Sequence, residues 1–172
     1  MKYPLGHNSW NLEEKRAAIK VLDSGFFTMG KIVKKFEEKF AKKFRAKYAT
    51  MVNSGSSANL LMMSTLKNLK KILKKKKIKK PNIIAPVVGW STSYYPISQN
   101  GFEINFVDVE LDTLNICPNE VEKAIDGNTV AILAINLLGN PCNFEKLENL
   151  SKKYNLILIE DNCESLGAVS NV

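Results

Sequence analysis

The segment Leu156–Glu164, with the sequence LILIEDNCE, decides the expected fold of this chain. Its four consecutive aliphatic residues predict a strand buried on both faces, which ends abruptly at two carboxylates, Glu160 and Asp161. In open α/β sheets, ligands bind in the crevice outside the carboxyl ends of the strands, so we expect Asp161 to project into such a crevice. A buried carboxylate needs a cationic partner, and neither His7 nor an arginine lies near it in the sequence. A cationic ligand is therefore one candidate for this partner.

Strand and helix patterns alternate along the rest of the chain. Strands are expected at residues 49–52, 82–87, 104–107, 130–135 and 156–159. Helices are expected at about residues 12–24, with Gly25 as the C-cap, at 32–44 with an aromatic core face, from about 58 onward, and at 119–125 and 144–154. This order predicts a three-layer α/β fold, in which right-handed crossovers build a mostly parallel sheet with helices on both faces.

The excess positive charge is confined to one segment. The chain of 172 residues has a net charge of +8, and nine lysines fall between Lys67 and Lys80; the remaining 16 basic and 17 acidic residues leave a net charge of −1. Leu66, Leu69 and the apolar residues that follow keep a helical spacing, so the lysines indicate the solvated face of a helix that ends before Pro81. A basic nucleic-acid-binding module stays open as an alternative.

Several other classes of protein are disfavoured by composition. No apolar run has the length of a membrane span, and the N-terminus lacks the layout of a signal peptide, so a cytoplasmic location is expected. Cys117, Cys142 and Cys163 are odd in number and widely spaced, which argues against a zinc site or a disulfide framework. We therefore expect no metal. With 45% apolar residues and no internal repeat or linker, the chain fits one domain that continues beyond residue 172.

Three further stretches follow strands and contain candidate binding residues. Residues 53–59, NSGSSAN, place small hydroxyl side chains around Gly55 at a strand-to-helix junction, where free helix amides favour a phosphate; a simple N-cap is the alternative. Trp90, in the hydroxyl-rich loop 87–96, could stack on a flat ring, although core packing is the alternative. Residues 136–141 form a Gly/Pro turn that indicates no more than a loop.

Asp161 completes the set of candidate binding residues. An aspartate in the crevice could bond a protonated pyridine nitrogen and so help a cofactor ring accept electrons. A phosphate site, a platform for a flat ring and a carboxylate together indicate pyridoxal 5'-phosphate.

The chain resembles the DegT/DnrJ/StrS nucleotide-sugar aminotransferase family of fold-type-I pyridoxal phosphate enzymes over nearly all of its length. The motifs that carry the resemblance are residues 27–30 with 36–40, then 53–58, 86–90, 106–109, 138–141 and 160–168. The resemblance implies that Ser56 and Ser57 bind the cofactor phosphate, that Trp90 stacks on its ring and that Asp161 pairs with the ring nitrogen. Glu164 falls where the family often has a glutamine near the ring hydroxyl.

The same resemblance implies what the whole protein does. Residues 1–172 would be an incomplete cofactor-binding large domain. The Schiff-base lysine, which a histidine replaces in a 3-dehydrase branch, would lie beyond Val172. We therefore expect weak or no turnover from residues 1–172 alone. The implied activity is transamination of a nucleotide-linked keto sugar for lipopolysaccharide or another surface polysaccharide. It implies an amino donor such as glutamate and a homodimer.

Two alternatives stay open. The first is a pyridoxamine 5'-phosphate-dependent nucleotide-sugar 3-dehydrase, which the motifs at 138–141 and 161–163 favour. Asn136 stands where other members have a histidine, so any role of that histidine is in doubt. The second alternative is an inactive remnant or the basic binding module.

Overall fold

The structure is a computed structural model that describes residues 8–69, 78 and 80–168. The chain divides into two compact units, Met1–Met51 and Val52–Val172. In the first unit, α1 spans Leu12–Asp23 and α2 spans Lys31–Lys43. Asn11 caps α1 at its start. The C-cap is Ser24 and not Gly25 as predicted; Gly25 follows it with a φ of +64°, the left-handed position in which glycine commonly ends a helix.

Helix α2 is amphipathic as predicted, but its aromatic stripe is not a buried core face. Phe40 stacks against Phe36 and Phe44, with ring centroids 5.6 and 4.5 Å apart. Phe36 is nevertheless 46% exposed, and Ala41 is the buried residue of the helix. The aromatic rings therefore cover one another and part of their area still faces solvent.

The strand predicted at residues 49–52 does not form. Its backbone pairs with no strand in the described part of the chain, and Met51 is exposed. The Met51 N–H donates instead to the Glu37 carboxylate, 2.8 Å away. The prediction was wrong because an apolar run of this length becomes a strand only where a neighbouring strand accepts its backbone hydrogen bonds.

The second unit alternates helices and strands. Its elements are α3 (Gly55–Asn68), β1 (Asn82–Pro86), α5 (Ser91–Gln99), β2 (Glu103–Val107), α6 (Pro118–Ala124), β3 (Thr129–Ile135), the short 3-10 helix η1 (Leu137–Gly139), α7 (Phe144–Tyr154) and β4 (Ile157–Asp161). Four predicted strands and the last two predicted helices are confirmed to within about two residues. The lysines at 70–77 and 79 lie outside the described residues, so the predicted basic helix face stays a prediction.

Helix α5 was missed because residues 91–96 read as a loop. Ser, Thr and Tyr are weak helix formers, and Pro96 lies inside the helix. Packing outweighs this local preference, since Ser93, Pro96 and Ile97 are all buried.

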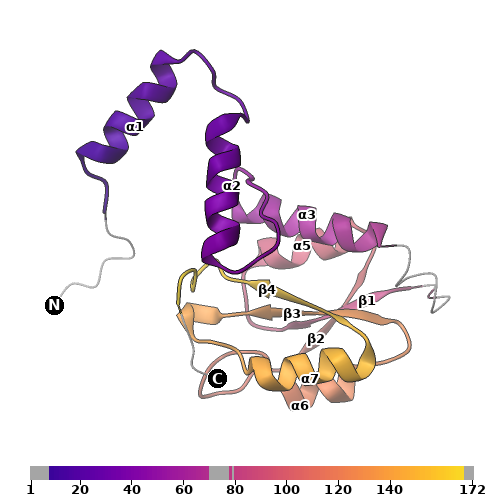
Figure 1. Cartoon of the computed structure of the whole chain (residues 1–172). Helices are drawn as coiled ribbons and strands as arrows, with labels where there is room; N and C mark the ends of the chain where they lie inside the picture. The colour runs from indigo at the N-terminus through magenta and orange to yellow at the C-terminus, as the bar shows by residue number, and fades with distance from the viewer. Residues whose placement is uncertain (1–7, 70–77, 79, 169–172) are drawn as a thin grey trace. The chain divides into compact units, whose positions relative to one another are not determined.

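The four strands form one parallel sheet in the order β2-β1-β3-β4. Figure 1 shows α3 and α5 on one face and α6 and α7 on the other, which confirms the predicted three-layer fold. A hydrophobic core lies on each face of the sheet, and β3 contributes side chains to both. Leu133 packs in the core with α3 and α5, and Ile132 packs in the core with α6 and α7.

Two strands of the described sheet, β1 and β3, are buried on both faces. Every residue of β3 is buried, whereas Ile157 and Leu158 of β4 are half-buried because β4 lies at an edge of this sheet. The run that predicted a doubly covered strand therefore belongs to an edge strand of the described sheet. Among the described residues, no helix combines the length and apolar character that a membrane crossing requires.

The strand order reverses between β1 and β3. From β1 the chain runs outward to β2, and it then returns to place β3 on the other side of β1. Such a reversal leaves a crevice at the carboxyl ends of the two strands, where α/β sheets bind ligands. This crevice holds most of the candidate residues.

Candidate functional site

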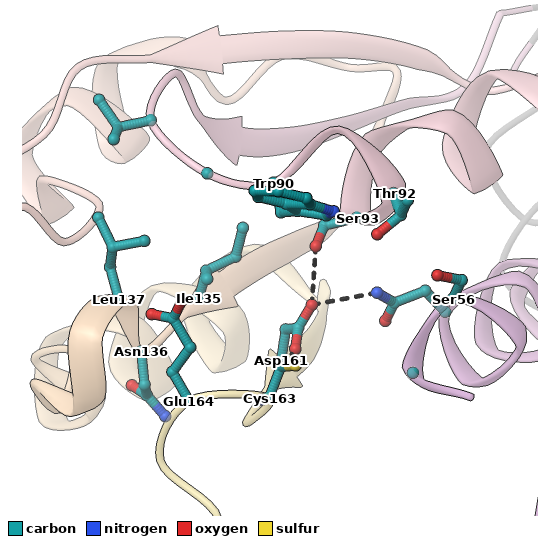
Figure 2. A pocket seen from close by; sticks show the side chains of 14 residues that line it. Ser56, Trp90, Thr92, Ser93, Ile135, Asn136, Leu137, Asp161, Cys163 and Glu164 are labelled. Atoms are coloured by element: carbon teal, nitrogen blue, oxygen red, sulfur yellow. Dashed lines mark hydrogen bonds between the residues drawn. The ribbon is translucent and has the colours of Figure 1, made fainter. Parts of the chain in front are cut away.

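A cavity of about 400 Å³ opens at the carboxyl ends of β1, β3 and β4 and at the start of α3 (Figure 2). Its lining consists of Gly55, Ser56, Asn59, Val88, Gly89, Trp90, Thr92, Ser93, Ile135, Asn136, Leu137, Asp161, Cys163 and Glu164. The volume falls in the range of small-molecule and cofactor sites, about 300–1,000 Å³. Four of the five predicted binding residues, Ser56, Trp90, Asp161 and Glu164, thus line one cavity.

Asp161 is the last residue of β4 and lines the cavity, as predicted. Its Oδ2 atom accepts hydrogen bonds from Ser93 Oγ at 2.8 Å and Asn59 Nδ2 at 3.0 Å, and its Oδ1 accepts one from the Cys163 N–H at 3.1 Å. No ion pair includes Asp161 within residues 8–69, 78 and 80–168. The expected cationic partner is therefore not a protein side chain of this region, since neutral donors hold the carboxylate.

Trp90 precedes the first residue of α5 and is 73% exposed. In Figure 2 its indole lies on the opposite side of the cavity from Asp161, with Ser93 between them. An indole with this exposure does not pack in a core, so the core-packing alternative is wrong. Its flat face is available to a planar ligand.

Ser56 lies in the first turn of α3, where the predicted N-cap is confirmed and the phosphate site stays a prediction. Ser54 is the N-cap, and its Oγ accepts the Ser57 N–H at 3.2 Å. The first-turn amides of Gly55 and Ser56 have no intrahelical acceptor, and both residues line the cavity. Ser57 does not line it, so its role in phosphate binding stays a prediction.

Glu164 forms a hydrogen bond with the turn that follows β3. Its carboxylate accepts a hydrogen bond from the Leu138 N–H. Leu138 has a φ of +55°, a strained value for a residue with a side chain, and this contact helps to hold it. Whether Glu164 also reaches a cofactor hydroxyl stays a prediction.

Asn136 is 4% exposed and joins three segments. Its Nδ2 donates to Glu160 Oε1 and Asn162 Oδ1, each at 2.8 Å, and its Oδ1 accepts the Cys142 N–H at 2.9 Å. The turn at 136–141 is thus more than the plain loop that its sequence indicated, because its first residue ties the ends of β3 and β4 together.

Tyr94 packs behind the cavity wall. Burial, and secondarily the negative charge of Asp161, raises the pKa of the Tyr94 hydroxyl to about 12. The neutral hydroxyl donates to the Pro86 carbonyl at 2.8 Å. Gly89 lies directly against this ring, and a Cβ there would overlap the Tyr94 hydroxyl and lie 2.9 Å from Ile135 Cδ1. Glycine therefore lets the chain between β1 and Trp90 pack onto Tyr94.

Sequence reasoning missed Asn59 and Ser93 as partners of Asp161. They lie 102 and 68 residues away from it along the chain. Both fall inside stretches that were singled out, 53–59 and 87–96, but nothing in those stretches indicates which carboxylate they bond.

Comparisons with known proteins agree with this fold. The chain matches the DegT/DnrJ/EryC1/StrS aminotransferase family over residues 9–171. It is 48% identical over 172 residues to the GDP-4-keto-6-deoxy-D-mannose 3-dehydratase of Escherichia coli O55:H7, covering 99% of this chain and 43% of that protein. It is 34% identical over 160 residues to the dTDP-3-amino-3,6-dideoxy-alpha-D-galactopyranose transaminase of Aneurinibacillus thermoaerophilus, covering 92% and 41%.

A solved structure shows the same fold. The E. coli GDP-4-keto-6-deoxy-D-mannose-3-dehydratase with bound hydrated PLP superposes with a TM-score of 0.89 at 48% identity, covering 99% of this chain and 43% of that one. The chain thus spans less than half the length of these relatives. Because the family match extends over nearly the whole sequence, the chain belongs to the DegT/DnrJ/EryC1/StrS aminotransferase family.

Proposed function

We propose that this protein binds pyridoxal 5'-phosphate or pyridoxamine 5'-phosphate in the cavity at the carboxyl ends of β1, β3 and β4. The observation that carries the proposal is the Asp161 carboxylate, which lines the cavity and accepts hydrogen bonds only from neutral donors among the described residues. A carboxylate of this kind suits a protonated ring nitrogen, because no cation of the described part of the chain already pairs with it. The exposed face of Trp90 and the free amides of α3 suit the ring and the phosphate of the same molecule.

Each residue then has a defined task. Ser56 and the first-turn amides of α3 bind the phosphate, with Ser57 as a further predicted contact. Trp90 covers one face of the ring, and Asp161 keeps a proton on the ring nitrogen. Glu164, whose carboxylate bonds to the Leu138 N–H, would lie near the ring hydroxyl. When bound, the cofactor supplies an electron sink for chemistry at a substrate carbon.

For the whole protein we propose 3-dehydration of a nucleotide-linked 4-keto sugar. Support comes from the 48% identity to a GDP-4-keto-6-deoxy-D-mannose 3-dehydratase, which exceeds the 34% identity to a transaminase. Transamination of a keto sugar is the second candidate, favoured by the family to which the chain belongs.

The proposal extends to the setting of the enzyme. Glutamate as amino donor, a homodimer, a cytoplasmic location and a role in surface polysaccharide synthesis belong to it. We also propose that residues 1–172 are part of a cofactor-binding large domain. The chain covers 43% of its relatives, which supports this assignment.

Cofactor binding is tested by titrating the chain with each cofactor and following absorbance and tryptophan fluorescence. We expect a saturable change that Asp161→Ala and Trp90→Ala abolish or strongly weaken. The matched control is Trp10→Ala, because Trp10 is also exposed but does not line the cavity. Absence of any saturable change with either cofactor would contradict the proposal.

The two reactions are separated by their products. The whole protein, not residues 1–172 alone, is incubated with a GDP-linked 4-keto-6-deoxy sugar, glutamate and cofactor, and the sugar is analysed by mass spectrometry. A dehydratase removes the 3-hydroxyl, whereas a transaminase adds an amino group at the keto carbon. An aminated sugar product would contradict 3-dehydration and support transamination.

A further inference from the structure

Two buried polar side chains, Asn59 and Ser93, converge on one oxygen of Asp161. Figure 2 shows the contact between Ser93 and Asp161. Asn59 is 6% exposed and belongs to the second turn of α3, and Ser93 is 4% exposed and belongs to the first turn of α5. Helices α3 and α5 pack against each other. Two helices thus tie their side chains to the end of β4.

Packing alone does not account for these two residues. Burying a side-chain amide or hydroxyl costs free energy unless a hydrogen bond compensates for the lost water. In the part of the chain that the structure describes, the side-chain hydrogen bonds of Asn59 and Ser93 both go to Asp161. Their burial is therefore compensated by the same carboxylate.

The contacts leave room for one more donor. An ionised carboxylate has about four lone-pair acceptor sites. Asn59 and Ser93 occupy Oδ2, and the Cys163 N–H occupies one site on Oδ1. About one acceptor site on Oδ1 stays available to a ligand in the cavity.

We propose that Asn59 and Ser93 are positioning residues, which fix the Asp161 carboxylate so that its free acceptor site receives the ring N–H of the cofactor. This inference rests on the proposed function. Neutral donors suit the task because they orient the carboxylate without cancelling its charge, whereas a lysine or arginine would compete with the ring cation. Both side chains act through Asp161 and not on the cofactor ring itself.

The test compares single variants of the chain for binding of pyridoxamine 5'-phosphate. We expect Ser93→Ala and Asn59→Ala each to weaken binding by about tenfold, because the carboxylate loses one charge-assisted hydrogen bond and its fixed orientation. The matched controls are Ser98→Ala on α5 and Asn68→Ala on α3, which remove the same groups at exposed positions outside the cavity.

A second readout reports on the ring nitrogen directly. The NMR shift of the ring nitrogen in isotope-labelled pyridoxamine 5'-phosphate distinguishes its protonated from its unprotonated form. We expect the protonated shift in the original chain, a change toward the unprotonated shift in Ser93→Ala and Asn59→Ala, and a larger change in Asp161→Ala. Ser93→Thr keeps a hydroxyl and should restore the protonated shift.

The outcomes separate this inference from the proposed function. If the original chain binds neither cofactor, the proposed function fails and the inference fails with it. If the chain binds and Asp161→Ala loses the protonated shift, but Ser93→Ala and Asn59→Ala match their controls in affinity and shift, the inference alone is overturned. Should Ser93→Ala fail to fold, Ser93→Cys keeps the side-chain size with a weaker donor, and an unchanged shift in that variant would equally overturn the inference.

Discussion

At the scale of single residues, the Asp161 carboxylate influences more than the donors that hold it. Its charge adds to burial in raising the pKa of Tyr94 to about 12, which keeps that hydroxyl protonated. The protonated hydroxyl donates to the Pro86 carbonyl at the end of β1. A charge that suits a cationic ligand therefore also helps to preserve a neutral contact behind the cavity.

The raised pKa of Tyr94 predicts a loss of stability at alkaline pH. Between the ordinary tyrosine pKa of 10.0 and about 12, the unfolded chain gives up the proton and the folded chain keeps it. The free energy of unfolding should therefore fall as pH rises through this window. Tyr94→Phe should flatten this fall and, below pH 10, cost about 1 kcal/mol through the lost hydrogen bond. Urea unfolding at a series of pH values measures both effects, and Tyr95→Phe, at an exposed position, is the control. If the unfolding free energy fell equally steeply with pH in Tyr94→Phe and in the original chain, Tyr94 would not be the group responsible.

The cysteines should differ sharply in reactivity. Cys142 is 4% exposed; burial, and then the charge of Glu160, raises the pKa of its thiol to about 12, whereas Cys163 is exposed at the cavity. Because the thiolate is the reactive form, iodoacetamide should modify Cys163 in the folded protein and Cys142 only after unfolding. Mass spectrometry of digested samples identifies the modified residue, and Cys163→Ser removes the fast reaction. Equal modification of both thiols in the folded chain would contradict the structure.

At the scale of elements, the connection from β1 to α5 determines where Trp90 lies. Val87 and Val88 follow the strand and are exposed, Gly89 packs on Tyr94, and Trp90 is the residue just before α5. The close contact at Gly89 leaves no space for a side chain. The position of the indole therefore depends on a glycine as well as on the tryptophan itself.

Gly89→Ala should consequently displace this connection. The added methyl group overlaps Tyr94 and Ile135, and we expect a destabilisation of about 1–3 kcal/mol together with weaker cofactor binding. Urea unfolding and the fluorescence titration measure the two losses. Gly127→Ala is the matched control, because a Cβ there meets no atom within 4 Å. Unchanged stability and binding in Gly89→Ala would show that the connection moves freely.

At the scale of the whole molecule, the central strand β3 joins the two cores of the second unit. Its side chains serve α3 and α5 on one face and α6 and α7 on the other, and all its residues are buried. The edge strand β4 carries the carboxylate but contributes less buried area. The described sheet thus places a fully buried strand beside the strand that carries Asp161.

Core truncations should reveal this difference. Leu133→Ala on β3 removes a fully buried side chain and should cost about 2–5 kcal/mol of unfolding free energy. Leu158→Ala, in register beside Ile132 but half-buried, should cost clearly less. The midpoints and slopes of urea unfolding give both values. An equal cost at the two positions would contradict the assignment of β3 as the central strand.

The sequence by itself determined the local features of this protein. Periodicity of two or of about 3.6 residues is a short-range property, so four strands, α6 and α7 were predictable, as was the carboxylate at the end of residues 156–159. The strand predicted at 49–52 and the missed α5 mark where tertiary contacts overrode local preference.

Only the tertiary structure decided which strand is central and which donors meet Asp161. Strand order follows from the direction of each crossover, which residue patterns within a strand do not encode. Asn59 and Ser93 reach Asp161 across 102 and 68 residues, and Asn136 joins segments that are distant in the sequence, because the parallel sheet brings the ends of separate strands to one edge. Four of the residues that line the cavity were thus predictable from sequence, while the hydrogen bonds that hold them together depended on the fold.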